Sequence, residues 1–140
     1  MITPNLRYLG QPLNFSWKWF LFSGEGRITR KQFWLYYIPY LLLTACVIIV
    51  DLEHGYFSDL FKGKVLTNVF GILTIYPCFA VTIKRFHDRG KSGLWSIVGL
   101  IPLLGWLWIF IDCGLLRGTE GANDYGLDPK EEKHIVDAFE

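Results

Sequence analysis

The sequence predicts an all-α integral membrane protein with three transmembrane helices and an N-terminal interfacial amphipathic helix. Three observations predict this fold class. The 140 residues are 51% hydrophobic and 17% aromatic, which is more apolar material than one soluble domain of this length readily buries. Three segments of 18 or 19 residues contain no charged side chain. Finally, most of the lysines and arginines lie on one predicted side of the membrane.

The three uncharged segments are residues 33–50, 65–83 and 94–111. As helices that rise about 1.5 Å per residue, each extends roughly 27 Å, close to a hydrocarbon core of about 30 Å. Helices satisfy their own backbone hydrogen bonds at that depth. A soluble helical bundle, the alternative, requires helices with a polar outer face, and these segments are apolar all round. We therefore expect each segment to span the membrane.

The third span is open to two interpretations. Its central sequence, IPLLGW at residues 101–106, contains Pro102, which removes a backbone donor and bends a helix. One kinked span is our prediction. The alternative is a re-entrant hairpin, in which two half-helices fold back on each other.

A shorter apolar segment precedes the spans. Residues 13–22, LNFSWKWFLF, are too few to cross a bilayer, but their tryptophans and single lysine suit the boundary between lipid and water. We predict an interfacial helix here, with a strand or loop packed on the bundle as the alternative. Residues 1–129 are then expected to form a single membrane domain, and residues 130–140 a short polar C-terminal tail.

The distribution of positive charge predicts the orientation. Nine of the 14 lysines and arginines lie before the first span or in the hinge between the second and third spans, residues 84–93. The other predicted side holds five, together with eleven acidic residues, among them Asp51 and Asp112. Because loops rich in lysine and arginine remain in the cytoplasm, we expect a cytoplasmic N-terminus and a periplasmic or exterior C-terminus.

The cations at that cytoplasmic surface form a candidate binding site for an anionic lipid or a phosphorylated ligand. Each lysine or arginine near a membrane surface attracts anionic head groups by roughly 1 kcal/mol, and the arginine fork matches phosphate geometry. Orientation with generic lipid contact is the simpler alternative. The candidate residues are Arg27, Arg30, Lys31, Lys84, Arg85, His87, Arg89 and Lys91.

The hinge also holds one carboxylate, Asp88. We expect it to be a structural ion-pair partner of Arg27 or Arg30, which would attach the hinge to the first span. No catalytic residue is predicted, because no nucleophile or metal-ligand set accompanies Asp88 and His87. No cofactor or metal site is predicted either, since the three cysteines are far apart and form no C-x-x-C pair.

Three stretches carry a family resemblance: FSGEGRITRKQFW at 22–34, VTIKRFHDRGKSGLW at 81–95 and GTEGANDYGLDP at 118–129. Together they resemble the motifs of domain-of-unknown-function family 805, the small YhaH-like bacterial inner-membrane proteins, and the resemblance extends over residues 17–129. It implies a multi-pass protein with three spans in a bacterial inner membrane, and no established activity. Leu127 stands where the family has a proline. The resemblance also marks a tail motif, formed by Asn123, Tyr125, Gly126, Asp128 and Pro129.

The leading functional prediction is a small non-catalytic membrane subunit or scaffold. It is expected to bind anionic membrane lipid and a protein partner, or a second copy of itself, through the cytoplasmic basic motif. One alternative is an accessory or oligomeric component of a transporter or channel, although the spans contain no acidic or basic side chain. Another is a membrane enzyme that acts on a phosphorylated lipid. A nucleic-acid partner is not expected, because the net charge is +1.

Overall fold

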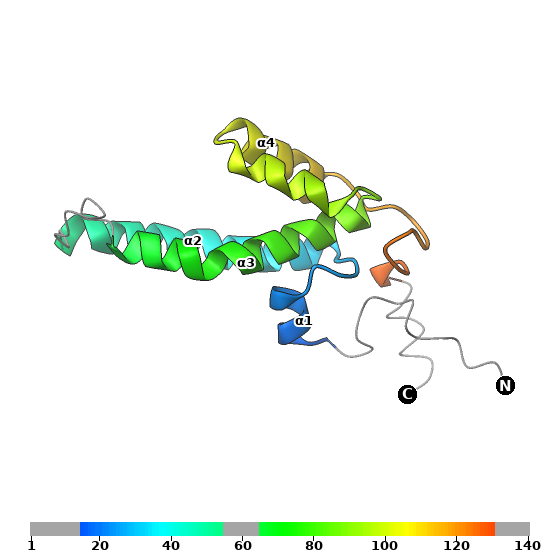
Figure 1. The fold of residues 1–140 in the computed structure, drawn as a ribbon, viewed down its shortest axis with the longest axis horizontal. Coiled ribbons are helices and arrows are strands. Elements are labelled where there is room, and N and C mark those ends of the chain that lie inside the picture. The colour runs from blue at the N-terminus through cyan, green and yellow to red at the C-terminus, as the bar shows by residue number, and fades with distance from the viewer. Residues whose placement is uncertain (1–14, 55–64, 131–140) are drawn as a thin grey trace.

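Two long helices, α2 (Arg30–His54) and α3 (Val65–Asp88), form the frame of the molecule and run antiparallel side by side (Figure 1). The computed structural model describes residues 15–54 and 65–130. Its other elements are α1 (Trp17–Phe22), the 3₁₀ helix η2 (Gly93–Leu100), α4 (Leu104–Ile109) and the π-helical turn η3 (Phe110–Leu115). Within the described residues the only extended pairing is an isolated bridge between Asn123 and Gly126. The all-α prediction is therefore confirmed.

Helices α2 and α3 contain the first two predicted spans. α2 begins at a capping box, in which Gln32 N donates to Thr29 Oγ1 at 3.2 Å and Thr29 N donates to Gln32 Oε1 at 2.8 Å. Both helices continue through their internal prolines, Pro39 and Pro77. By length and composition, each helix is long and apolar enough to cross a membrane.

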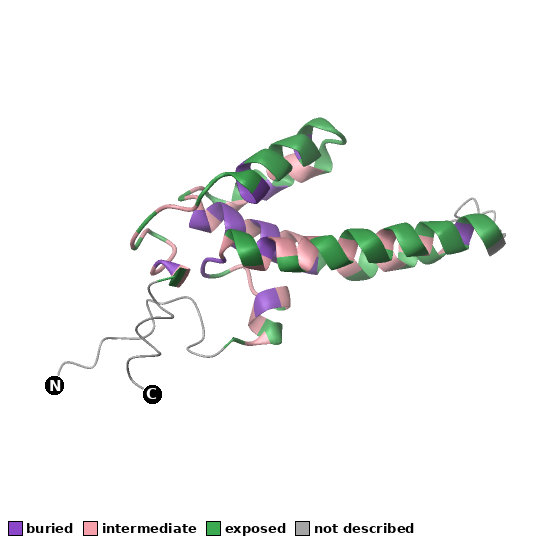
Figure 2. Cartoon of the chain, turned by 180° about the vertical axis from the view of Figure 1, so that it is seen from behind, coloured by how far each residue is buried: buried purple, intermediate pink, exposed green. Residues whose placement is uncertain are grey.

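The apolar surface of these two helices is mostly uncovered (Figure 2). Only 6% of an apolar 18-residue stretch of α2 is buried, and only 17% of the corresponding stretch of α3. A soluble monomer rarely exposes a contiguous apolar surface of more than a few hundred Å². A surface of this kind therefore requires an apolar solvent, and the prediction of an integral membrane protein is confirmed.

The third predicted span is not a single helix. Residues 93–100 run away from the end of α3 as η2, and the chain reverses at residues 101–103. α4 returns beside η2, and η3 continues from it to pack against α2 and α3 (Figure 1). We call residues 93–115 the hairpin. The rings of Trp95 and Trp108 stack across it with centroids 5.9 Å apart. The prediction of one kinked span at 94–111 is wrong, and the alternative, a hairpin of two half-helices, is what the chain forms.

The reversal depends on three features within four residues of sequence. Pro102 has no backbone donor, and Leu103 takes a positive φ of 62°, which few residues other than glycine adopt. At Gly105 an added Cβ would lie 1.7 Å from Val98 O, so only glycine lets the two limbs come so close. At about 2.0 Å per residue η2 extends roughly 16 Å. At about 1.5 Å per residue the returning limb extends roughly 18 Å, and both limbs are short of a bilayer core of about 30 Å.

The two ends of the helix pair are held together differently. At the end far from the chain termini, Asp51 Oδ2 accepts from Thr67 N at 2.7 Å and Oδ1 accepts from Leu66 N at 3.2 Å. A carboxylate near the end of α2 thus caps the first turn of α3. The opposite end holds the small apolar core, which consists of Phe20, Ile28, Phe33, Val81, Phe86 and Cys113.

Helix α1 packs against α3 near that core (Figure 1). The helix predicted at 13–22 is present at Trp17–Phe22, while residues 13 and 14 lie outside the described part of the chain. Trp17 and Phe22 are 65% and 57% exposed, as side chains facing the lipid boundary would be. The location of α1 at the membrane surface stays a prediction.

Candidate functional site

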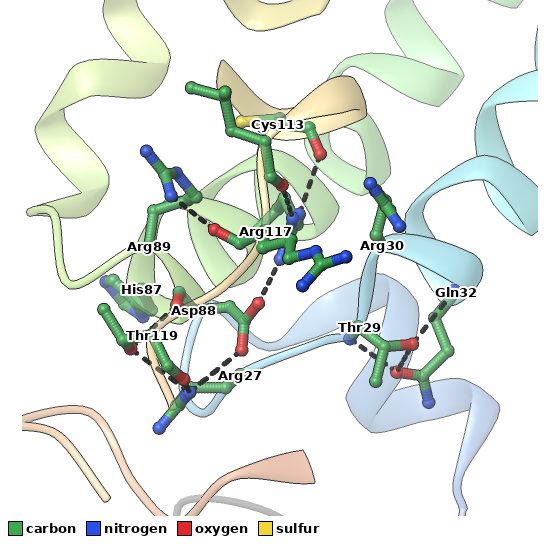
Figure 3. Close-up of polar contacts among 12 residues, drawn as sticks. Arg27, Thr29, Arg30, Gln32, His87, Asp88, Arg89, Cys113, Arg117 and Thr119 are labelled. Atoms are coloured by element: carbon green, nitrogen blue, oxygen red, sulfur yellow. Dashed lines mark hydrogen bonds and ion pairs between the residues drawn. The ribbon is translucent and has the colours of Figure 1, made fainter. Parts of the chain in front are cut away.

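Four charged side chains are buried together where α2 begins and α3 ends, and we call them the polar hub: Arg27, Lys84, Arg85 and Asp88. The Asp88 carboxylate lies between two guanidinium groups. Its Oδ1 is 3.1 Å from Arg27 Nη2, and its Oδ2 pairs with Arg85 Nη1 (Figure 3). Both arginine side chains are fully buried and that of Asp88 is 6% exposed. Of the two partners expected for Asp88, Arg27 is the one in contact with it.

Arg27 also attaches the segment that follows the hairpin. Its Nη1 donates to Gly121 O at 2.7 Å and to Gly126 O at 3.1 Å, and its Nη2 donates to Thr119 O at 2.6 Å. Thr119 N in turn donates to Asp88 O at 2.7 Å. These contacts exclude a bilayer between the two segments, so the prediction that residues 116–129 lie across the membrane from the hinge is wrong. Because the hairpin reverses the chain, the residues that follow it lie at the same end of the molecule as the hinge.

The tail motif contacts the hinge through His87. The rings of His87 and Tyr125 stack with centroids 3.9 Å apart, and Asn123 Nδ2 donates to His87 O at 2.9 Å. Asp128 Oδ2 accepts from Gly121 N at 3.3 Å and closes the tail on itself. The segment fits tightly, since a Cβ added at Gly118 would lie 2.0 Å from Asp88 Oδ2.

Arg85 and two neighbours, Arg30 and Trp34, bind the carbonyls at the end of the hairpin. The last carbonyls of a helix have no partner within it and need donors from elsewhere. Four consecutive carbonyls receive such donors here. Arg85 Nε donates to Cys113 O at 2.8 Å, Trp34 Nε1 to Gly114 O at 3.0 Å, Arg30 Nη1 to Leu115 O at 2.8 Å and Arg85 Nη2 to Leu116 O at 2.6 Å. Cations at a helix C-terminus also oppose its dipole favourably.

Lys84 has the corresponding role for α1. Its Nζ donates to Trp19 O at 2.9 Å, Phe20 O at 2.6 Å and Ser23 O at 2.6 Å. The ammonium also lies 4.6 Å from the centroid of a Trp19 ring, at a distance that permits a cation–π interaction. All three protons of the ammonium are therefore occupied, and its charge holds the end of α1 against α3.

A second ion-pair group joins the hinge to the hairpin. Asp112 Oδ1 is 2.7 Å from Lys91 Nζ and 3.6 Å from Arg89 Nη2. Asp112 was predicted on the side opposite the hinge, and the reversal of the hairpin brings it to the hinge instead. Lys91 Nζ also lies 5.2 Å from a Trp108 ring centroid.

His87 lies beyond the apolar stretch of α3, which ends at residue 83. Burial lowers the pKa of its imidazole, and the hydrogen bond to the Gly26 carbonyl opposes that shift. Because a carbonyl only accepts, the 3.3 Å contact assigns the proton to His87 Nδ1. The neutral ring therefore fits the contacts that it makes with Gly26 and Tyr125.

The structure divides the eight candidate binding residues by exposure. Arg27, Lys84 and Arg85 are buried, and their donors bind carbonyls and Asp88. His87, Arg89 and Lys91 are half-buried, whereas Arg30 and Lys31 are exposed.

Sequence reasoning missed Trp34, Asp112 and Thr119, which bind the hub or its neighbours. Trp34 and Thr119 lie inside the motifs quoted above, and no feature of the residues alone assigned them a partner. Their contacts join segments that are 80 and 92 residues apart.

The arrangement is built to hold segments together. Both Asp88 oxygens accept from guanidinium groups in a buried setting, so the carboxylate is bound as an ion-pair partner of two arginines. Among residues 15–54 and 65–130, no group of three or more His, Cys, Asp or Glu side chains is placed to hold a metal ion. The hub joins α1, α2, α3, the hairpin and the tail at one end of the molecule.

Comparison with known proteins places these features in a family. A family model described as a protein of unknown function, DUF805, matches residues 21–127. The chain is 36% identical over 108 residues to the inner membrane protein YhaH of Escherichia coli K12, which covers 77% of this chain and 88% of that protein. It is 31% identical over 109 residues to the inner membrane protein YhaI of the same strain, with coverage of 78% and 86%.

A third relative, the uncharacterized protein YiiR of that strain, is 32% identical over 142 residues, with coverage of 84% and 92%. No solved structure matches the chain. The resemblance inferred from the three motifs is confirmed, and the chain belongs to the DUF805 family of proteins of unknown function.

Proposed function

We propose that this chain is a non-catalytic protein of the bacterial inner membrane that binds anionic phospholipid head groups at its cytoplasmic surface. In this proposal it acts as a small subunit or scaffold, with a protein partner or a second copy of itself. The observation that carries the proposal is the division of the candidate cations into buried ones, whose donors are occupied, and exposed ones at the same end of the molecule.

Head-group binding is assigned to the exposed members. Arg30 and Lys31 lie in the first turn of α2, and Lys18 and Arg117 are further exposed cations near the same end. Arg30 Nη1 donates to Leu115 O, and the other nitrogens of its guanidinium group remain available to a phosphate. Each such cation contributes roughly 1 kcal/mol of attraction to an anionic surface.

The location and orientation follow from two supports. YhaH and YhaI are named inner membrane proteins, and nine of the 14 lysines and arginines lie before α2 or in the hinge. Under the positive-inside rule, the hinge end of the helix pair faces the cytoplasm. Because residues 116–130 are hydrogen-bonded to that end, we place them on the cytoplasmic side as well.

A binding role is favoured over a chemical one by the hub itself. Its carboxylate is shielded and its cations are fixed by several hydrogen bonds each. A rigid junction of this kind orients a surface for binding without needing to exchange protons or electrons with a substrate.

The proposal is tested by purifying the intact protein from its membrane in mild detergent and measuring retained lipids by native mass spectrometry. In the Arg30→Gln/Lys31→Gln variant, the ratio of phosphatidylglycerol and cardiolipin to phosphatidylethanolamine should fall about 30-fold, because two cations of roughly 1 kcal/mol each are removed. The Glu53→Gln variant, which removes an exposed charge near the opposite end of α2, should retain the original ratio. An unchanged ratio in the double variant would overturn head-group binding, and a lone protomer without any bound chain would overturn the scaffold role.

A further inference from the structure

A large apolar groove lies between the helix pair and the hairpin. It has a volume of about 1010 Å³ and is lined by all three segments. In Figure 1 the hairpin leaves the end of α3 at an angle to the helix pair, so the two bodies diverge with distance from the hinge. Its walls include Tyr37 and Leu41 of α2, Phe79 of α3, and Leu100 and Leu107 of the hairpin.

The groove is kept open because the hairpin is fixed only at its root. There, Arg85 binds two hairpin carbonyls and Lys91 Nζ lies 2.7 Å from Asp112 Oδ1. At the tip, Leu103 and Leu104 are 76% and 74% exposed, so this end of the hairpin is largely uncovered. Voids larger than a water molecule are rare in packed proteins, so a groove of this volume in a membrane holds hydrocarbon or another helix.

The wall chemistry favours hydrocarbon chains over a helix. Helices that pair inside membranes approach through small residues, and this groove presents mainly large side chains, with glycine only at Gly71 and Gly99. Flexible chains conform to an irregular wall of aromatic and branched side chains without needing a matching surface.

The polar groups lie where a phospholipid needs them. Tyr37 and Thr82, whose hydroxyls are 2.6 Å apart, line the groove near the hinge. Beyond them, the exposed Arg30 lies one turn before the groove residues Phe33 and Trp34. From this end towards Gly71 the α2 and α3 lining is mainly aliphatic, and the hydroxyl of Thr44 is bound within its own helix by Tyr40 O. This is the polarity order of a head group followed by its chains.

We propose that the groove between α2, α3 and the hairpin binds the acyl chains of an anionic phospholipid of the surrounding bilayer, with the head group at Arg30 and Lys31. This inference rests on the head-group binding proposed above and adds a defined site to it. The bound lipid would fill the groove, which the hairpin cannot close because it is fixed at its root.

The test introduces a side chain into the groove without disturbing the protein. A Cβ at Gly71 meets no atom within 4 Å, so Gly71→Phe directs a ring into the groove. The matched control is Ile72→Phe, because Ile72 is 69% exposed and lies outside the groove. Each variant is reconstituted in nanodiscs of phosphatidylglycerol and phosphatidylethanolamine, extracted in mild detergent, and weighed by native mass spectrometry.

Gly71→Phe should retain several-fold less phospholipid per protomer than the original chain, whereas Ile72→Phe should retain the original amount. Equal retention in both variants would overturn the groove site. Loss of a dimer in Gly71→Phe with unchanged lipid would assign the groove to a second copy and would also overturn the proposal. If the groove site fails, a selective loss of anionic lipid in Arg30→Gln/Lys31→Gln still supports head-group binding, so the two failures are distinguishable.

Discussion

Arg27 and Asp88 are 61 residues apart in the sequence, yet Arg27 Nη2 and Asp88 Oδ1 form an ion pair of 3.1 Å in a fully buried setting. Arg27 precedes the first long helix and Asp88 ends the second. Because Arg27 also binds three carbonyls of the tail, this single pair connects three segments. The buried members of the basic motif, Arg27, Lys84 and Arg85, therefore form a structural junction.

Removal of the Asp88 carboxylate should unfold that junction. Asp88→Ala leaves two buried guanidinium groups without a counter-charge, and loss of one partner of a buried pair lowers the free energy of unfolding by about 3–5 kcal/mol. Equilibrium unfolding in mixed micelles measures this change. Glu25→Gln, which alters an exposed carboxylate of the neighbouring loop, is the control and should unfold as the original protein does. Equal stability of the two variants would contradict the junction.

The hairpin predicts that the N-terminal segment and the tail are accessible from the same side of the membrane. Single cysteines are placed at the exposed positions Glu25, Ala122 and Glu53 after Cys46, Cys78 and Cys113 are replaced. An impermeant maleimide should label Glu25→Cys and Ala122→Cys from one side and Glu53→Cys from the other. Labelling of Ala122→Cys together with Glu53→Cys would instead require the third segment to cross the bilayer.

Gly118 is expected to be essential for tail docking. In Gly118→Ala the new Cβ meets the Asp88 carboxylate, with Oδ2 only 2.0 Å away. Overpacking of this type costs about 1–3 kcal/mol, which corresponds to hydrogen exchange about 5- to 150-fold faster in the peptide that contains Thr119. Ala122→Ser, at an exposed position in the same segment, should leave the exchange rate unchanged. Normal protection of that peptide in Gly118→Ala would show that the tail tolerates the methyl group.

The short helix α1 should depend on Lys84. Six residues are too few for a stable isolated helix, and the Lys84 ammonium binds three of its terminal carbonyls. Lys84→Met removes these charged hydrogen bonds, so the amides of Phe20 and Ser23 should lose their protection from exchange. Lys18→Met changes an exposed lysine of the same helix and should have no such effect. Protection that persists in Lys84→Met would mean that apolar packing alone holds α1.

Acidification should weaken the contact between the tail and the hinge through His87. Burial lowers the pKa of this imidazole, so its folded-state pKa lies below the usual unfolded value of about 6.5. The stabilisation is complete above that value and is lost as the pH falls through it towards the folded-state pKa. Unfolding measured from pH 8 to pH 5 should show a smaller loss of stability in His87→Gln, which stays neutral. Identical pH profiles would contradict this role, because His54 and His134 are common to both proteins.

Several features of the fold were readable from particular residues. The uncharged segments at 33–50 and 65–83 became the apolar parts of α2 and α3, since length and composition alone decide whether a helix is soluble in hydrocarbon. The capping box of Thr29 and Gln32 is likewise a local feature, because both partners lie within one turn. The motifs at the hinge and the tail also identified the family correctly.

The course of the third segment was not readable from composition. Residues 94–111 are apolar whether they form one span or two short limbs, and the choice depends on the close approach of Gly105 to Val98 and on the carbonyl partners at the root. The side on which the tail lies follows from that choice. Charge counting consequently assigned Asp112 and residues 116–129 to the wrong side.

The sequence by itself thus determined which solvent the helices require, where they begin, and which cations gather at one end, because these are properties of local composition and spacing. Only the tertiary structure decided what those cations bind. A buried guanidinium or ammonium takes whichever acceptors lack partners, and here these are carbonyls at the ends of α1, the hairpin and the tail, supplied by segments up to 99 residues away.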